Sequence, residues 1–141
     1  MPTATAPALA SRLRLSATRL ARTLRREAGT GLSPSQLSAL SAIDSHGSMT
    51  LGALAVHERV APPSITKVVA KLAQAGLVDR ELDPNDRRVA RVALTRAGHD
   101  LLDESRRRKD AWLSARLAQL DSDKRSRLAA ALDVLDELTQ T

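Results

Sequence analysis

Two pairs of basic residues in the middle of the chain have the chemistry to bind phosphate groups. Arg87 and Arg88 are adjacent in the stretch DPNDRRVARVALT, directly after a Pro-Asn pair that is typical of a tight turn. Lys67 and Lys71 are four residues apart, so a helix would present both on one face. Guanidinium and ammonium groups both bind phosphate oxygens, which indicates recognition of an anion rather than bond-breaking chemistry.

Each pair could also be an ordinary set of solvated surface charges, and the residues alone do not exclude this interpretation. Most surface lysines are simply solvated. An arginine at a turn often pairs with a neighbouring carboxylate such as Asp83 or Asp86, and an exposed pair of this kind contributes little to stability. The elements that hold the two basic pairs therefore decide their interpretation.

The spacing predicts that the two lysines lie on an amphipathic helix. At about 100° per residue, one stripe of this helix is apolar. The stripe consists of Ile65, Val68, Val69 and Leu72. The opposite side and its flank carry Ser64, Thr66, Lys67, Ala70, Lys71 and Gln74. Such a helix is anchored by one face and can enter a major groove with the other, where lysine reaches guanine edges or phosphates.

Capping and turn signals divide the chain into six helices and one hairpin. The expected helices cover about residues 8–26, 34–46, 51–60, 64–74 and 96–120, with a last one from 122 onward. The expected strands cover 77–82 and 89–94, joined by the turn 83–88. The middle of the chain is thus a helix-turn-helix followed by a two-stranded wing, and the fold class is mainly α with a small β-wing.

The place of the hairpin favours a functional interpretation of its tip. A hairpin directly after a major-groove helix lies beside it, so its tip meets the adjacent minor groove. Arginine suits a narrow minor groove because its guanidinium is weakly hydrated and the potential there is strongly negative. We therefore expect Asp83 or Asp86 to hold one of Arg87 and Arg88, leaving the other to insert.

Composition narrows the class of protein. The 141 residues suffice for one domain, and the 1% of aromatic residues is too few for a stacking platform for single-stranded nucleic acid. The formal charge of +6 favours an anionic partner. No apolar run is long enough to span a bilayer. The Arg-rich N-terminus resembles a transit peptide, but its leucines recur at helical spacing, so we expect a structural helix and a cytoplasmic protein.

Catalytic and metal sites are not expected. The chain has no cysteine, which excludes disulfides and thiolate chemistry. It has no phosphate-binding glycine loop, no nucleophile elbow and no carboxylate pair with a plausible pocket, so we expect no enzyme. His46, His57 and His99 are scattered without metal-ligand spacing, and we expect neither a metal site nor a cofactor.

Taken together, these features resemble the MarR family of bacterial winged-helix transcriptional regulators. The helix start LSPSQLSAL, the helix-turn-helix TLGALAVHERVAPPSITKVVAKLAQAGLVDR, the wing DPNDRRVARVALTRAG and the flanking helices carry the resemblance. It extends over about residues 9–138, and the wing with its Leu-Thr-x-x-Gly exit is the most specific part.

The resemblance implies a ligand-responsive repressor that binds double-stranded DNA as a homodimer on a palindromic operator. It implies one MarR-like domain over 1–141, in which 8–31 and 96–141 form dimerisation helices and 33–95 the DNA-binding lobe. The DNA-binding residues that it implies are Ser64, Thr66, Lys67, Lys71, Arg87 and Arg88. A small-molecule effector, often an aromatic acid, would bind between the two parts, and no residue identifies it.

Two residues depart from the family pattern. Ala61 stands where Ser or Thr often caps the helix that enters the major groove, called the reading helix below. A missing cap costs about 1 kcal/mol, which Pro62 or Pro63 would partly offset by fixing the backbone. Lys67 stands where arginine is frequent, and lysine makes less bidentate contact, so base preference at that position stays open.

The residues leave two further questions open. The leucine stripes of the first and last helices suit a dimer interface or an intramolecular core equally well. The same lobe could also be a winged-helix protein-interaction module or a sequence-independent architectural DNA binder. A steep salt dependence separates DNA binding from binding to an acidic protein, and the ratio of specific to non-specific affinity separates a regulator from an architectural protein.

Overall fold

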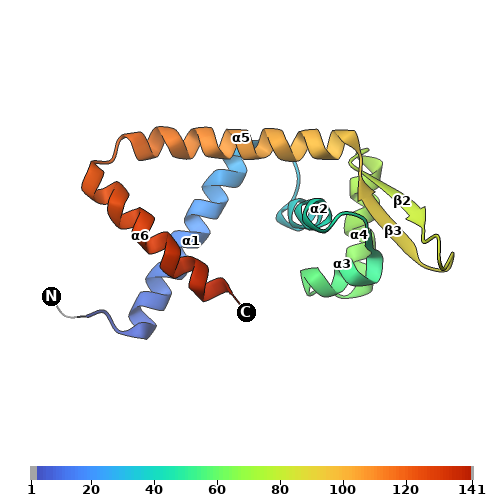
Figure 1. Ribbon diagram of the computed structural model, residues 1–141, viewed down its shortest axis with the longest axis horizontal. Coiled ribbons are helices and arrows are strands. Elements are labelled where there is room, and N and C mark those ends of the chain that lie inside the picture. Colours follow the sequence, from blue (N-terminus) through green and yellow to red (C-terminus); the bar gives the residue numbers. More distant parts are fainter. Residues whose placement is uncertain (1–2, 141) are drawn as a thin grey trace.

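The computed structural model describes residues 3–140, which form the six expected helices, the two expected strands and one further short strand. The first part of the chain forms α1 (Ala6–Ala28), α2 (Pro34–His46), β1 (Met49–Thr50), α3 (Leu51–Glu58) and α4 (Pro62–Gln74). The second part forms β2 (Val78–Leu82), β3 (Ala90–Leu94), α5 (Arg96–Ala118) and α6 (Ser122–Thr139). Figure 1 shows an elongated molecule in which α5 joins a lobe made of α2–β3 to an arm made of α1 and α6.

Side chains cap the helices where the sequence predicts. Ser33 Oγ accepts the amide of Gln36 at 3.2 Å, and the Gln36 side chain accepts the amide of Ser33 at 2.9 Å, which completes a capping box. Thr50, Thr95 and Asp121 cap α3, α5 and α6 in the same way, each accepting an amide three residues on. The capped starts therefore match the sequence expectation closely.

The sheet has one strand more than expected. The order is β1-β3-β2 with antiparallel pairs, and the register places Val92 of β3 opposite both Met49 and Arg80. The strand β1 is only two residues long, so alternation in the sequence could not reveal it. Its pairing ties the segment before α3 to the hairpin, so the wing is attached to the helix-turn-helix through the sheet as well as through its own chain ends.

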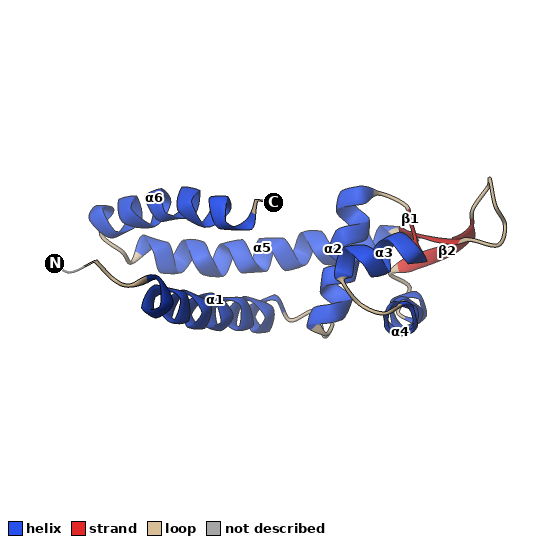
Figure 2. Cartoon of the chain, turned by 90° about the horizontal axis from the view of Figure 1, so that it is seen from below, coloured by secondary structure: helices blue, strands red, loops and turns tan. Residues whose placement is uncertain are grey.

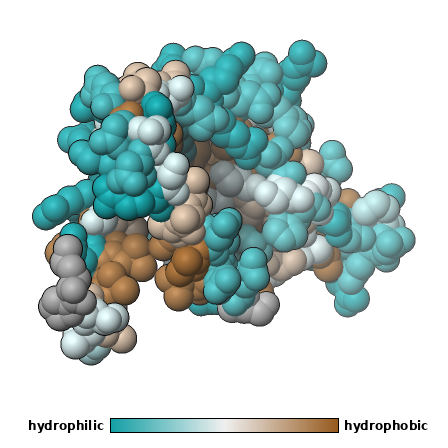
Figure 3. All heavy atoms as spheres, turned by 60° about the vertical axis from the view of Figure 1, so that its left-hand side comes forward, coloured by the Kyte–Doolittle hydropathy of each residue, from teal (hydrophilic) through white to brown (hydrophobic). Residues whose placement is uncertain are grey.

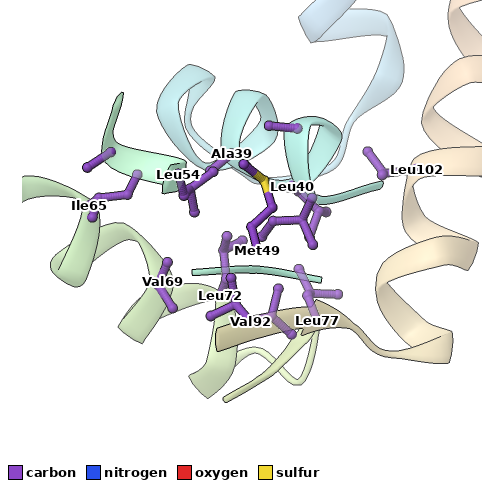
Figure 4. Packing of buried hydrophobic residues seen from close by; sticks show 14 residues of the cluster. Ala39, Leu40, Met49, Leu54, Ile65, Val69, Leu72, Leu77, Val92 and Leu102 are labelled. Carbon is purple, nitrogen blue, oxygen red and sulfur yellow. The ribbon is translucent and has the colours of Figure 1, made fainter. Parts of the chain in front are cut away.

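The buried hydrophobic residues of the lobe form an apolar core (Figure 4). Its largest fully buried hydrophobic side chains are Leu40, Ile43, Leu54, Val69, Leu72 and Val92. These residues come from α2, α3, α4 and β3, and Leu102 of α5 closes one side of the core. Each helix of the lobe thus buries one apolar stripe against the others, as the amphipathic spacing predicts.

The helix α5 is fastened to the lobe at its N-terminal end. Thr95 Oγ1 donates to the carbonyl of Gly76 at 2.7 Å, and the Thr95 amide donates to the carbonyl of Leu77 at 3.1 Å. A Cβ at Gly98 would lie 2.3 Å from the Leu77 carbonyl oxygen, so only glycine fits at this close approach. Asp44 of α2 also accepts a hydrogen bond from Arg106 of α5 at 3.0 Å.

The arm presents its apolar side chains to solvent in the single chain. Seven large apolar residues of α1 and α6 are more than a third exposed, namely Leu9, Leu15, Leu20, Leu128, Leu132, Val134 and Leu138. No residue of α6 is buried in the described part of the chain. Figure 2 shows α6, α5 and α1 as three separate layers, and Figure 3 shows hydrophobic residues gathered on this end of the molecule.

Across residues 3–140, no helix has the length and apolarity to cross a membrane.

Candidate nucleic-acid interface

The helix α4 separates its two faces as the wheel predicts. Ile65, Val69 and Leu72 are buried in the core of the lobe. The candidate contact residues Ser64, Thr66, Lys67 and Lys71 are all exposed. The buried face, seen in Figure 4, fixes the orientation of the helix, and the exposed face is free to meet a ligand.

The N-terminus of α4 is built without a capping side chain. Ala61 is the N-cap residue, as expected, and makes no side-chain hydrogen bond. The first two helical residues, Pro62 and Pro63, have no amide hydrogen, and the amides of Ser64 and Ile65 both donate to the Ala61 carbonyl, at 3.0 and 3.2 Å. The prolines therefore remove donors that a cap would satisfy, so the missing cap costs less than its usual value of about 1 kcal/mol.

The two lysines of α4 carry uncompensated charge. Lys67 and Lys71 lie one turn apart on the exposed face, and within residues 3–140 neither pairs with a carboxylate. Like charges at this spacing repel weakly, which costs a few tenths of a kcal/mol in the free helix. An anionic partner would remove this repulsion. Thr66 differs from them because its hydroxyl already donates to the Pro62 carbonyl at 3.0 Å and is left mainly as an acceptor.

The wing turn is ordered by its two aspartates. The Asp83 amide donates to the Val89 carbonyl at 2.8 Å and closes the hairpin. Asp83 Oδ1 accepts the amides of Asn85 and Asp86, at 2.8 and 3.3 Å. This Asx-type turn fixes the backbone from which both wing arginines extend.

The wing arginines differ in their partners. Asp86 binds Arg88 through the amide and Nε on one carboxylate oxygen, both at 3.1 Å, and through a terminal nitrogen on the other oxygen at 3.3 Å. The Arg88 side chain is nevertheless 92% exposed, so its guanidinium is both oriented and accessible. Arg87 is exposed and forms no ion pair within the described residues. The expectation that an aspartate holds one arginine is confirmed for Arg88.

These contacts lower the pKa of both carboxyl groups below their ordinary value of 3.8. For Asp83 the main cause is the hydrogen bond from the Asn85 amide, and Arg91 adds to it. For Asp86 the main cause is the side-chain hydrogen bond from Arg88. Both aspartates are therefore ionised at neutral pH and can hold the turn.

Arg91 is a structural residue of the wing that the sequence analysis did not single out. Its guanidinium donates to Asp83 Oδ2 at 3.1 Å and to both the hydroxyl and the carbonyl oxygen of Ser48, at 3.0 and 2.9 Å. Ser48 is 43 residues earlier in the chain, so local spacing could not reveal this contact. A basic residue in an otherwise apolar strand was the only available signal.

Comparison with known proteins identifies the family. The sequence model of the MarR family matches residues 32–90. An uncharacterized HTH-type transcriptional regulator of Mycobacterium leprae is 49% identical over 131 residues, which cover 92% of each chain. The chain belongs to the MarR family. An HTH-type transcriptional regulator of Mycobacterium tuberculosis is 45% identical over 128 residues, which cover 90% of each chain.

A solved structure supports the same assignment for the whole fold of this MarR-family chain. A protein from Pseudomonas aeruginosa, described as a putative transcriptional regulator, superposes with a TM-score of 0.87 at 36% identity and covers 99% of each chain. The chain is therefore a DNA-binding, winged helix-turn-helix transcriptional regulator of the MarR family, and the family and its relatives indicate a regulator rather than an enzyme.

Other polar and aromatic groups of this MarR-family chain lie on elements other than α4 and the wing. A shallow groove of about 840 Å³ between α1 and α2 is lined by Arg19, Arg22, Arg25 and Arg26. Trp112 of α5 is half-buried, with the Arg116 guanidinium 5.0 Å from its ring centre. The ring centres of His46 and His57 lie 4.7 Å apart in an edge-to-face arrangement. Within residues 3–140, no three side chains that could bind a metal ion lie together.

Proposed function

We propose that this protein is a ligand-responsive repressor that binds a palindromic operator as a homodimer. Each lobe would insert the exposed face of α4 into a major groove and the tip of the wing into the adjacent minor groove. One observation carries the proposal: an anchored helix and a wing turn both present exposed basic side chains. The helix presents two lysines that pair with no carboxylate within residues 3–140, and the turn presents two arginines.

Within this interface the residues have different roles. Lys67 and Lys71 would contact phosphates or guanine edges, and Ser64 would contact a base or a phosphate through its hydroxyl. The Thr66 hydroxyl, which already donates to Pro62, would accept a hydrogen bond from a base. Arg87 and Arg88 would reach the minor groove, where a narrow A·T-rich segment attracts guanidinium groups most strongly. The phosphate contacts set affinity and register, whereas the base and groove contacts set specificity.

The exposed leucines of the arm support the homodimer. Seven large apolar side chains on α1 and α6 are left open to solvent by the described part of the chain, and such a surface is typical of a protein–protein interface. Charge supports a second copy as the cover, since α1 carries six arginines and one acid between Arg12 and Glu27, and the last turns of α6 carry three acids and no base after Leu128. Two lobes held this way would meet successive major grooves, about 34 Å apart.

The arginine-lined groove between α1 and α2 supports a ligand response. It lies where the arm meets the lobe, so a ligand there would contact both parts. Its guanidinium groups favour an anionic molecule, and the family resemblance suggests an aromatic acid. An effector of this kind would act by changing the angle between lobe and arm. Such a regulator acts in the cytoplasm, where its DNA is.

The test is fluorescence anisotropy of the full-length protein on a library of duplexes enriched for palindromes, titrated across salt with unlabelled competitor DNA. We expect tight binding to a two-fold-symmetric subset, with log K falling linearly and steeply against log[salt]. Salt-sensitive binding without sequence preference would instead indicate an architectural protein. Absence of binding at low salt would indicate a protein-interaction module and refute the proposal.

A further inference from the structure

The end of the hairpin is not held by packing. In β2 only Val78 is buried, and the strand is exposed from Asp79 to Leu82. A two-stranded hairpin is marginally stable without a surface to pack on. Something other than apolar contact must therefore fix the direction of the wing turn, 83–88, relative to α4.

Arg91 supplies a polar connection from the turn to the body of the lobe. Its side chain is two-thirds buried, and it bridges Ser48, which directly precedes β1, and Asp83, which directly follows β2. Three of its five N–H groups are used in these contacts, two on Ser48 and one on Asp83. A guanidinium that donates to three acceptor atoms of two residues is held in one orientation.

The connection continues from Arg91 into the turn. Asp83 uses Oδ2 for Arg91 and Oδ1 for the amides of Asn85 and Asp86, so one carboxylate joins the arginine to the turn backbone. Asp86 in turn holds Arg88 through its amide and its guanidinium. An unbroken series of hydrogen bonds thus runs from Ser48 through Arg91 and the two aspartates to a wing-tip arginine.

We propose that Arg91 is a positioning residue that fixes the wing turn relative to the reading helix and thereby sets the contribution of the wing to DNA affinity. The DNA half of this inference rests on the proposed function. Arg91 acts through Arg87 and Arg88 rather than on DNA, since three of its five N–H groups bind Ser48 and Asp83 and two-thirds of its side chain is buried. Without it, Asp83 is no longer held from the side of the lobe, so the hydrogen bonds of the turn open more often and the turn samples several directions.

The first test measures order in the free protein by amide hydrogen exchange. We compare the full-length wild type with Arg91→Gln and with the control Arg96→Gln. Arg96 is 93% exposed and has one exposed partner, Asp100, so its substitution removes the same charge near the wing without breaking the connection. For Arg91→Gln we expect exchange in the peptide covering 83–90 to rise about tenfold, and exchange in α4 to stay unchanged.

A conservative variant separates geometry from charge. Arg91→Lys keeps the charge, but an ammonium group cannot bridge Ser48 and Asp83 with the planar geometry of a guanidinium. We expect its wing to exchange nearly as fast as that of Arg91→Gln. If Arg91→Lys exchanges like the wild type, charge alone orders the wing, and a positioning role for the guanidinium is wrong. Unchanged exchange in Arg91→Gln would equally overturn the inference.

The second test is a double-mutant cycle on DNA. It compares two duplexes that differ only in the base pairs flanking the site, which are A·T-rich in one and G·C-rich in the other. Arg91→Gln should weaken binding to the A·T-flanked duplex about threefold to tenfold and change binding to the G·C-flanked duplex little. Added to the Arg87→Ala/Arg88→Ala variant, it should cause no further loss. A further loss of similar size would show that Arg91 acts on DNA without the wing arginines.

The two tests separate the inference from the proposed function. If the wild type binds no duplex, the proposed function and the DNA half of the inference are both wrong. The exchange measurement still decides whether Arg91 orders the wing, because it uses no DNA. If DNA binding holds and exchange in Arg91→Gln is unchanged, only the inference fails.

Discussion

The lobe and the arm of this protein differ in how far a single chain buries their apolar side chains. The lobe from α2 to β3 buries a continuous core in which Leu40, Val69 and Val92 are fully inaccessible. The arm has long, well-capped helices, yet α6 buries no residue that the structure describes, and Leu138 is 66% exposed. A helix can thus be specified locally by its caps and spacing while its apolar face still lacks a partner.

Because of this difference, substitution of a leucine should have different consequences in the two regions. A leucine in the lobe contributes to the stability of the single chain, because its removal leaves a cavity. A leucine in α6 contributes little within the chain and, under the proposed function, contributes to the contact between two copies. Substitutions in the two regions should therefore separate folding from assembly.

The largest effect is expected for Leu132→Asp in α6. Leu132 is 50% exposed, so the single chain should tolerate a carboxylate there. In the proposed dimer it would bury two charges, one from each copy, and weaken association roughly 1,000-fold. Sedimentation equilibrium measures the dissociation constant, and Ser126→Asp, on the other side of α6, is the control. An unchanged constant for Leu132→Asp would show that this face is not the dimer contact.

The next largest effect is expected for Leu40→Ala in the lobe. Leu40 is fully buried, so the removal of its apolar packing and the cavity left behind should lower the free energy of unfolding by about 3 kcal/mol. Urea unfolding followed by circular dichroism measures this change, with Leu132→Ala as the matched control in the arm. Equal losses for the two variants, measured in a monomeric background, would remove the contrast between lobe and arm.

Single substitutions at the wing tip should have an intermediate effect. Arg87→Ala and Arg88→Ala should each weaken binding to DNA with A·T-rich flanks, by about tenfold for the arginine that inserts. Anisotropy titrations on operators that differ only in their flanks measure this, and the larger loss identifies the inserting residue. If neither variant changes the affinity for either flank, the wing does not contact DNA.

Lys71→Ala should have a smaller and more uniform effect. Because a lysine that binds a phosphate contributes to all duplexes alike, affinity should fall a few-fold irrespective of sequence. The slope of log K against log[salt] should become shallower by about 1 for each phosphate that the variant no longer neutralises. A loss confined to one base sequence would instead place Lys71 on a base edge.

The smallest effect is expected from acid. The pKa of Asp83 and of Asp86 is lowered in the folded state, so their contribution to stability is fully present above the ordinary value of 3.8. It is lost as the pH falls through the lower, folded-state pKa. Wing chemical shifts should therefore stay constant between about pH 7 and pH 5 and change only in stronger acid. A transition near pH 6 would point to a histidine instead.

Much of the fold could be predicted because its signals are local. Ser33 and Gln36 form a capping box from residues three apart, and Ile65, Val69 and Leu72 define a buried face by spacing alone. Gly76, which follows the C-cap residue of α4, has a positive φ, as glycine commonly has after the end of a helix. Each of these features depends on neighbours within a turn or two of helix.

The remaining features depend on residues far apart in the chain. The strand β1 is too short to show alternation and exists because it pairs with β3. The contact between Arg91 and Ser48 spans 43 residues, and the spacing around Arg91 contains no sign of it. The leucines of α6 match a helical core and a subunit interface equally well by period, so only their exposure in the folded chain separates the two.

The most direct test of the account changes the distance between half-sites of the operator that the duplex library selects. If two complete lobes read DNA through a dimer of arms, inserting about five base pairs turns one half-site to the opposite side of the duplex. Binding of the wild type should then fall to the level of a single half-site. An affinity that survives this insertion unchanged would show that the two lobes are not held in register by the arm.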